Sequence, residues 1–267
     1  MDGKTGLNRL VGKVAIVTGS SRGIGLAIAR GYAREGANLT LVGRDERTLA
    51  GPAEELRSYG VRVLPVQADV SDQNDVERLV ARTVDEFGRV DVLVNNAGIQ
   101  YRLPSEQMDI EGWRRVIDTN LTGVFMCCQA AGRVMLRQRS GSIVNIASLS
   151  SFVGMPQRAP YGTAKTAVVG LTRVLAAEWG RRGVRVNAIA PGYILTEMTR
   201  KAIATGMLDP QEIIARTPLG RLGEPEDMVG LAIFLASDES AFLTGQTIAA
   251  DGGFLAYGYL KSGSEVE

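Results

Sequence analysis

The sequence contains no histidine among its 267 residues. Histidine is the commonest metal-binding side chain and the commonest general base near neutral pH. Its absence disfavours zinc-dependent alcohol dehydrogenation and Ser/His hydrolysis, and we expect no metal site. Any acid–base chemistry must therefore use Tyr, Lys, Asp or Glu.

Cysteines and long apolar runs are scarce as well. The two cysteines, Cys127 and Cys128, are adjacent in a helical pattern, so they cannot join distant segments, and a reducing compartment is expected. The apolar runs fall short of the roughly 20 residues that cross a bilayer, and the opening residues MDGKTGLNRLVGK lack the apolar core of a signal peptide. These features predict a cytoplasmic protein with no membrane partner.

Neither sign of charge is in excess. Lys and Arg together number 30, Asp and Glu 29, and there is no basic block of the kind that follows a phosphate backbone. Nucleic acid is therefore not an expected partner.

Short β-branched runs alternate with longer helical patterns. The strand-like runs are residues 14–18, 39–42, 61–66, 90–94, 143–146, 184–189 and 247–250, and the helical patterns include 25–35, 46–59, 75–87, 113–138 and 161–181. Apolar strands joined by crossover helices predict the Rossmann fold, a doubly wound parallel α/β sheet with helices on both faces. We expect one such domain over residues 1–267.

One stretch breaks this pattern. Residues 194–223 contain Pro210, Pro218 and several glycines and are too long for an ordinary connection, so they are a candidate substrate lid. The polar residues 261–267 are expected to fray.

A glycine-rich turn follows the first predicted strand. It reads Thr18-Gly19-Ser20-Ser21-Arg22-Gly23-Ile24-Gly25 and leads into an alanine-rich helix. Glycines let the backbone approach a pyrophosphate, which the helix N-terminus then holds. The alternative is a tight strand-to-helix turn with no ligand.

The end of the second strand bears on the choice of cofactor. It reads Leu41-Val42-Gly43-Arg44, with no carboxylate to repel a 2′-phosphate, and both Arg44 and Arg22 can contact that phosphate. We therefore predict that NADP(H) is preferred over NAD(H). Alternatively, Arg44 is a solvated cation neutralised by Asp45.

Tyr161 and Lys165 are four residues apart in a helical pattern, so their side chains share one face. A lysine cation ~4 Å from the phenol, at an effective dielectric constant of about 20, stabilises the phenolate by about 4 kcal/mol. Ser148 follows a strand at the edge where ligands bind, and its hydroxyl can polarise a substrate oxygen. If no other motif accompanied them, Tyr161 and Lys165 would be interpreted as an interfacial tyrosine beside a snorkelling lysine. Ser150 and Ser151 are alternatives to Ser148.

From Gly12 to Gly253 the chain resembles the short-chain dehydrogenase/reductase family. The matching motifs, in order, are T-G-x-x-x-G-I-G at 18–25, Asn95-Asn96-Ala97-Gly98, Asn120 in Asp118-Thr119-Asn120, Ser148, Tyr161-x-x-x-Lys165, and Pro191-Gly192 with Thr196.

The resemblance implies an oxidoreductase that moves a hydride between a nicotinamide cofactor and a carbonyl or secondary alcohol. It implies that Tyr161 exchanges the proton, that Lys165 favours the phenolate and binds the nicotinamide ribose, and that Ser148 steadies the reacting oxygen. Asn120 would hold a water that joins Lys165 to solvent.

The same resemblance implies further cofactor contacts. These are Asp69 and Val70 with adenine, Asn96, Ala97, Gly98, Pro191 and Gly192 along the cofactor, and Ile194 and Thr196 with the carboxamide. Structural roles stay open for several of them: Asn95 and Asn96 as turn formers, Asn120 as a satisfied helix-interior amide, and Thr196 as a helix cap.

Residues expected around the substrate are polar and cationic. They are Gln100, Arg102, Gln157, Arg158 and Tyr193. If two of these side chains face inward, a polyol, sugar or keto-sugar acid is favoured; alternatively, both arginines rest on the rim in water.

Within the family, the chain is similar to gluconate 5-dehydrogenases and, second, to 3-oxoacyl-carrier-protein reductases. Leu149 departs from the polar residue expected after Ser148 in the first group. An alternative of another class is a catalytically silent NADP(H)-binding protein. The resemblance to the family implies a homotetramer, and the apolar residues 254–260 would suit an interface better than water.

Overall fold

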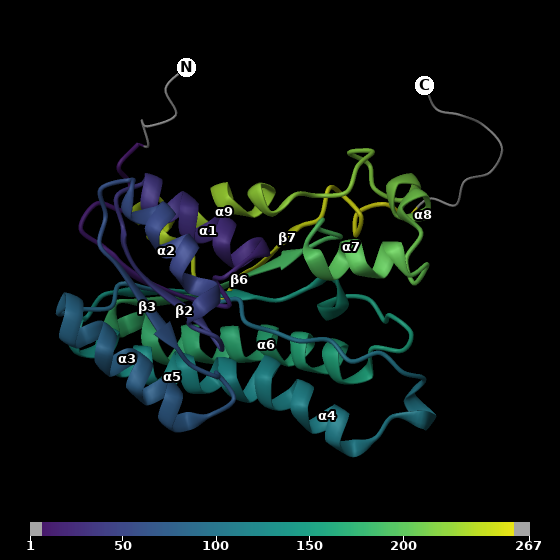
Figure 1. The fold of residues 1–267 in the computed structure, drawn as a ribbon, viewed down its shortest axis with the longest axis horizontal. Coiled ribbons are helices and arrows are strands. Elements are labelled where there is room, and N and C mark those ends of the chain that lie inside the picture. The colour runs from purple at the N-terminus through teal and green to yellow at the C-terminus, as the bar shows by residue number, and fades with distance from the viewer. Residues whose placement is uncertain (1–6, 259–267) are drawn as a thin grey trace.

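The computed structural model describes residues 7–258, which form a seven-stranded sheet with all strands parallel (Figure 1). The strands are β1 (Val14–Thr18), β2 (Asn38–Gly43), β3 (Val63–Gln67), β4 (Val92–Asn95), β5 (Gly141–Ile146), β6 (Val184–Pro191) and β7 (Thr247–Ala250). Their order in the sheet is β3-β2-β1-β4-β5-β6-β7. The order reverses between β1 and β4, the place where doubly wound sheets bind ligands at their carboxyl ends.

Helices cover both faces of the sheet. They are α1 (Gly23–Arg34), α2 (Arg47–Arg57), α3 (Gln73–Phe87), α4 (Ile110–Ile117), α5 (Gly123–Gln138), α6 (Ala159–Trp179), α7 (Glu197–Ala204), α8 (Pro210–Ala215) and α9 (Val229–Ala236). In Figure 1, α1, α2 and α9 lie above the sheet, and α3, α4, α5 and α6 lie below it. The predicted Rossmann architecture is therefore confirmed.

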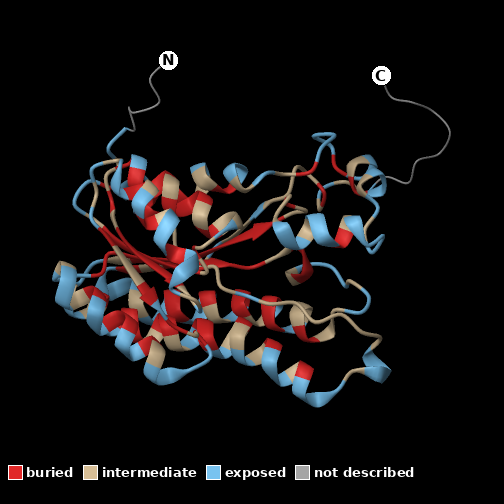
Figure 2. Ribbon diagram, viewed as in Figure 1, coloured by how far each residue is buried: buried red, intermediate tan, exposed pale blue. Residues whose placement is uncertain are grey.

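The core consists of two apolar layers, one on each face of the sheet (Figure 2). Every residue of β1 is buried, because a central parallel strand meets helices on both sides. Along β1 the side chains alternate between the layers: Val17 packs under α1 and α9, and Ile16 packs against the side covered by α3 and α5.

All seven predicted strands are present, with bounds that differ by at most two residues. The predicted continuous helix over 113–138 is wrong. The helical region instead begins earlier, with α4, and a π-helical turn at Asp118–Thr122 separates α4 from α5. A π turn shifts the backbone ladder by one residue, a rearrangement that apolar periodicity does not reveal.

Residues 194–223, hereafter the 194–223 segment, project from the carboxyl end of the sheet and include α7 and α8 (Figure 1). Neither of these helices was predicted. The two ends of the segment meet: the Leu195 amide donates to the Gly223 carbonyl at 2.8 Å, and the Gly223 amide donates to the Tyr193 carbonyl at 2.9 Å. The segment therefore leaves the end of β6 and comes back to the same place before α9 begins.

The start of the expected interface tail packs within the chain instead. Phe254 is buried against Tyr193, with ring centroids 5.5 Å apart, and the Arg216 guanidinium lies 4.5 Å from the Phe254 ring centre. Tyr259, Leu260 and residues 261–267 lie outside the described residues. Within residues 7–258, no helix is long and apolar enough to cross a membrane.

Candidate active site

A cleft of about 560 Å³ opens at the carboxyl ends of β1 and β4. The predicted residues that line it are Gly19, Ser21, Arg22, Gly23, Ile24, Arg44, Asp69, Val70, Asn96, Ala97, Gly98, Gln100, Arg102, Ser148, Arg158, Tyr161, Lys165, Pro191, Gly192, Tyr193, Ile194 and Thr196. Of the other predicted site residues, Gly25 and Asn120 lie behind its wall, and Gln157 is exposed and does not line the cleft.

The glycine turn is held from below by Asn96. The Asn96 side-chain amide donates to the carbonyls of Thr18 and Gly19, both at 3.0 Å. A methyl group on Gly25 would lie 2.4 Å from the Gly19 oxygen and from the Asn96 amide nitrogen. Glycine is therefore required at position 25 for backbone packing behind the cleft, and Asn96 does more than form a turn.

The first turn of α1 fits a pyrophosphate. Arg22, at its N-cap, makes no side-chain cap hydrogen bond, and the first turn has no acidic residue. Gly23 has a φ of +57°, in the left-handed region that glycine tolerates. The amide groups that begin α1 therefore face the cleft without a side-chain acceptor, which is the arrangement that binds phosphate oxygens.

Charged side chains lie on both sides of this turn. Arg44 is exposed at the end of β2, and Asp45 pairs with Arg47 at 2.8 Å, so the predicted neutralisation of Arg44 by Asp45 does not occur. Arg22 instead forms an ion pair with Glu197, the first residue of α7.

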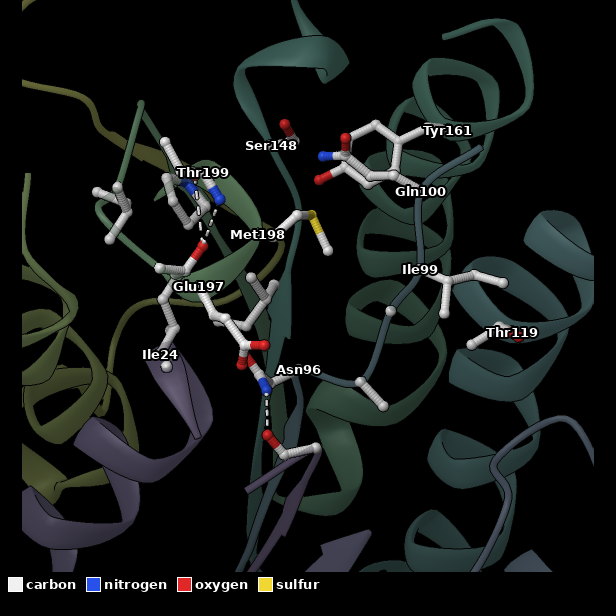
Figure 3. A pocket seen from close by; sticks show the side chains of 18 of the residues that line it. Ile24, Asn96, Ile99, Gln100, Thr119, Ser148, Tyr161, Glu197, Met198 and Thr199 are labelled. Atoms are coloured by element: carbon white, nitrogen blue, oxygen red, sulfur yellow. Dashed lines mark hydrogen bonds between the residues drawn. The ribbon is translucent and has the colours of Figure 1, made fainter. Parts of the chain in front are cut away.

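Ser148, Tyr161 and Gln100 lie together at one end of the cleft (Figure 3). The Ser148 hydroxyl oxygen accepts the Ser150 amide at 3.1 Å, which leaves its own proton free to donate. Ser151 donates to the Lys165 carbonyl at 2.8 Å and so fastens the serine turn to α6, the helix that also holds Tyr161.

Lys165 is the charged group behind Tyr161. Its ammonium nitrogen lies 5.8 Å from the Tyr161 ring centre and donates to the Ile146 carbonyl at 2.5 Å. Burial lowers the pKa of Lys165 to about 8, because only 3 % of the residue is exposed. The cation therefore lies close to the Tyr161 ring, where it can stabilise a phenolate through space.

The π turn puts Asn120 beside the cleft wall rather than in it. Asn120 is fully buried, and its amide both accepts from the Ile99 amide (2.9 Å) and donates to the Ile99 carbonyl (2.8 Å). The side chain is thus the satisfied helix-interior amide considered above. It fixes the backbone just beyond Gly98.

Asn95 has a different role from Asn96. It donates to Asn145 at 2.9 Å, and Asn145 donates to Thr172 of α6 at 3.0 Å. Cys128 of α5 accepts from Asn95 at 3.2 Å. This buried polar chain ties the two helices to β4 and β5.

The end of the cleft that holds Ser148 and Tyr161 is cationic. Arg102 and Arg158 both line it, and burial, together with repulsion from Arg158, lowers the pKa of Arg102. The Arg102 guanidinium donates to Gln100 at 3.2 Å, and Arg158 contacts the Met155 sulfur at 3.5 Å. Among the described lining residues the carboxylates are Asp69 and Glu197, so neither arginine has an acidic partner there.

Several lining residues were not named individually as site residues, although the lid at 194–223 was predicted as a whole. They are Ile99, Thr119, Met155, Glu197, Met198, Thr199, Lys201 and Leu208, among others. Those from the 194–223 segment enter the wall because α7 faces the cleft, with Thr196 accepting the Thr199 amide at its N-cap. Figure 3 shows Glu197, Met198 and Thr199 across the cleft from Thr119 and Ile99.

Comparison with known proteins extends this picture. The family model described as Enoyl-(Acyl carrier protein) reductase matches residues 19–255. A 3-oxoacyl-[acyl-carrier-protein] reductase of Synechocystis sp. is 42 % identical over 94 % of this chain and 100 % of that protein. A gluconate 5-dehydrogenase of Gluconobacter oxydans is 42 % identical over 91 % of this chain and 95 % of that protein.

A solved structure is similar as well. The gluconate 5-dehydrogenase of Burkholderia cenocepacia, in complex with NADP and tartrate, superposes with a TM-score of 0.89 at 39 % identity. The match covers 93 % of this chain and 97 % of that chain.

Proposed function

The chain belongs to the short-chain dehydrogenase/reductase family, whose members are oxidoreductases acting on CH–OH or carbonyl groups, and we propose that it uses NADP(H) and a polyol, sugar or keto-sugar acid. Within that class we favour an anionic sugar acid.

One observation supports this substrate class above the others. Arg102 and Arg158 face the same end of the cleft as Ser148 and Tyr161, and neither is paired with a carboxylate of the described lining. Two unneutralised guanidinium groups that repel each other are stabilised by a bound carboxylate, which each can contact through two hydrogen bonds. The tartrate held by the Burkholderia enzyme is likewise a hydroxylated acid.

The proposed mechanism assigns each step to a side chain. The cofactor supplies the hydride chemistry, and the protein positions the reacting carbon and moves the proton. Ser148 donates a hydrogen bond to the substrate oxygen, because its hydroxyl accepts the Ser150 amide and keeps its own proton available. Tyr161 gives a proton to that oxygen in reduction and takes it in oxidation, and the Lys165 cation stabilises the phenolate.

The proposed preference for NADP(H) rests on Arg44 and Arg22. Both line the cleft near the glycine turn, and no ion pair holds Arg44 within residues 7–258. The glycine turn and the first turn of α1 would hold the pyrophosphate, Asp69 and Val70 the adenine, and Ile194 and Thr196 the carboxamide. The 194–223 segment would act as the lid over the substrate.

A second candidate is reduction of a 3-oxoacyl thioester. The Synechocystis reductase is as similar as the Gluconobacter enzyme, and apolar side chains of Met155, Met198 and Leu208 line part of the cleft. An acyl chain could pack on these groups, whereas the two arginines would then contact solvent or an acidic carrier.

Absorbance at 340 nm separates the candidates. Purified protein is assayed with NADPH, NADP+, NADH and NAD+ against 5-ketogluconate, gluconate, simple ketoses, polyols and an acetoacetyl thioester. We expect turnover of sugar acids; turnover of the thioester alone would replace the sugar-acid proposal with the acyl-reductase one, and no turnover would favour a silent binding protein.

A variant tests the arginines directly. Arg102→Ala should raise the KM for the sugar acid roughly 10- to 100-fold, since a charged hydrogen bond contributes about 1.5–3 kcal/mol, and should change the KM for a neutral polyol little. Arg82→Ala, exposed on α3 and away from the cleft, is the matched control. Equal effects on acid and polyol would contradict carboxylate recognition.

We also propose a homotetramer in a reducing compartment such as the cytoplasm. Phe125 on α5 and Val174 on α6 are 42 % and 53 % exposed, which suits a helix-pair interface, and Phe242 is exposed close to the edge strand β7. Cys127 and Cys128 are free thiols. Light scattering after gel filtration tests the assembly, and a monomer at micromolar concentration would contradict it.

A further inference from the structure

An ion pair joins the glycine turn to the 194–223 segment across the cleft. Arg22, directly before α1, donates through Nη1 to Oε2 of Glu197, 175 residues further along the chain. Both side chains line the cleft and both are 71 % exposed. A ligand can therefore reach either partner, and the pair itself is weak enough to be exchanged.

Glu197 differs from the other carboxylate of the described lining. Asp69 accepts from the Ser71 amide at 3.0 Å and from the Ser71 hydroxyl at 2.7 Å, so it is engaged by its own turn. Glu197 instead occupies Arg22, one of the two arginines beside the glycine turn. Because Glu197 is paired with Arg22, this ion pair must be broken before Arg22 can bind a phosphate group of the cofactor, and breaking it costs free energy.

This cost depends on the cofactor. A 2′-phosphate has a charge of roughly −2 near neutral pH, attracts Arg22 and repels a carboxylate close to it. NAD(H) has only a hydroxyl at this position and leaves the Arg22–Glu197 pair intact. We propose that Glu197 is a specificity-determining residue for the cofactor: it competes with the 2′-phosphate for Arg22 and so limits the preference for NADP(H) over NAD(H).

The competition also couples the cofactor to the segment. The backbone bonds between Tyr193, Leu195 and Gly223 hold only its base, whereas the Glu197 contact ties the start of α7 to the glycine turn. A 2′-phosphate that takes Arg22 releases α7 from this tie. NADP(H) and NAD(H) therefore leave the 194–223 segment with different mobility.

The inference rests on the proposed binding of NADP(H) in this cleft, and two fragments that cannot turn over test it. Adenosine 2′,5′-bisphosphate has the 2′-phosphate and 5′-AMP lacks it. Calorimetric titration gives the Kd of each fragment for the wild-type protein, for Glu197→Gln and for the control Glu212→Gln, which removes an exposed carboxylate from α8.

We expect Glu197→Gln to bind adenosine 2′,5′-bisphosphate about two- to fivefold more tightly, the range of an exposed ion pair, with 5′-AMP unchanged. The gain should disappear in an Arg22→Leu background, because no competition remains there, and Glu212→Gln should show no gain. Hydrogen exchange in α7 should be faster with the bisphosphate than with 5′-AMP in the wild-type protein, and equal in Glu197→Gln.

Unchanged or weaker bisphosphate binding by Glu197→Gln would overturn the inference and would mean that the carboxylate orients Arg22 instead. If Glu197→Gln shows no gain but the wild-type protein binds the bisphosphate more tightly than 5′-AMP, the inference fails and the proposed preference for NADP(H) stands. If the wild-type protein has no preference and Glu197→Gln gains one, the inference holds and the proposed preference fails; no preference in either protein overturns both.

Discussion

Replacing Lys165 by methionine should change how stability depends on pH. Lys165 is 3 % exposed, and burial lowers its pKa from 10.5 to about 8. The unfolded chain keeps this proton up to about pH 10.5, whereas the folded chain releases it near pH 8. Between these values the folded state binds fewer protons, so the free energy of unfolding rises with pH.

The size of the effect follows from the shift. At 1.36 kcal/mol per pKa unit, burying the cation costs about 3 kcal/mol, a penalty fully present below pH 8 and relieved by pH 10.5. About 2 kcal/mol of this falls between pH 7 and pH 9.5. Methionine has a similar length and no proton to lose, so the variant lacks this contribution while it also loses the proposed support for the phenolate.

Urea unfolding followed by the fluorescence of Trp113 and Trp179 measures the difference. Wild-type protein and Lys165→Met are compared at pH 7, 8, 9 and 9.5 at one protein concentration, since assembly affects stability. The wild-type value minus the variant value should rise by about 2 kcal/mol over this range. The exposed Lys201→Met is the control and should show a flat difference. A difference for Lys165 that stays constant within about 0.5 kcal/mol would refute the buried-cation argument.

Two further substitutions test the proposed site. Tyr161→Phe should lower turnover by roughly 10²- to 10⁴-fold, the usual contribution of a general acid–base group, and should leave the Kd of adenosine 2′,5′-bisphosphate within about twofold; near-normal turnover would defeat the mechanism. Gly25→Ala should weaken that Kd at least roughly tenfold and destabilise the fold by about 1–3 kcal/mol, because its methyl group meets Asn96 and Gly19 at 2.4 Å. Gly51→Ala, in open space on α2, should stabilise by up to about 1 kcal/mol; equal behaviour of the two alanines would contradict the packing argument.

The sheet was predictable because its causes are local in sequence. Buried parallel strands need β-branched apolar runs, and the runs at 14–18 and 184–189 match β1 and β6 within two residues. The glycine turn and the Tyr161–Lys165 pair were predictable for the same reason, because each depends on residues that are neighbours in the sequence.

Contacts between distant segments were not predictable. The π turn at Asp118–Thr122 contains Asn120, whose side chain accepts a hydrogen bond from the Ile99 amide. A contact of this kind between distant residues has no signature in helical periodicity. The Arg22–Glu197 pair joins residues 175 positions apart. The helices α7 and α8 are short, eight and six residues, so that apolar periodicity has too few turns to reveal them.

The closed base of the 194–223 segment has a consequence for how new specificities arise in this scaffold. Because the paired backbone of Leu195 and Gly223 closes the base of the segment, and Thr217 to Leu219 pack on Gly252 and Gly253, residues 198–215 are the part whose length and sequence can vary with least effect on β6 and α9. Ser148, Tyr161 and Lys165 all lie outside it. The fold thus separates a replaceable part, which selects what enters, from a fixed part, which reacts with it, and exchanging residues 198–215 between relatives is a direct route to a different substrate range.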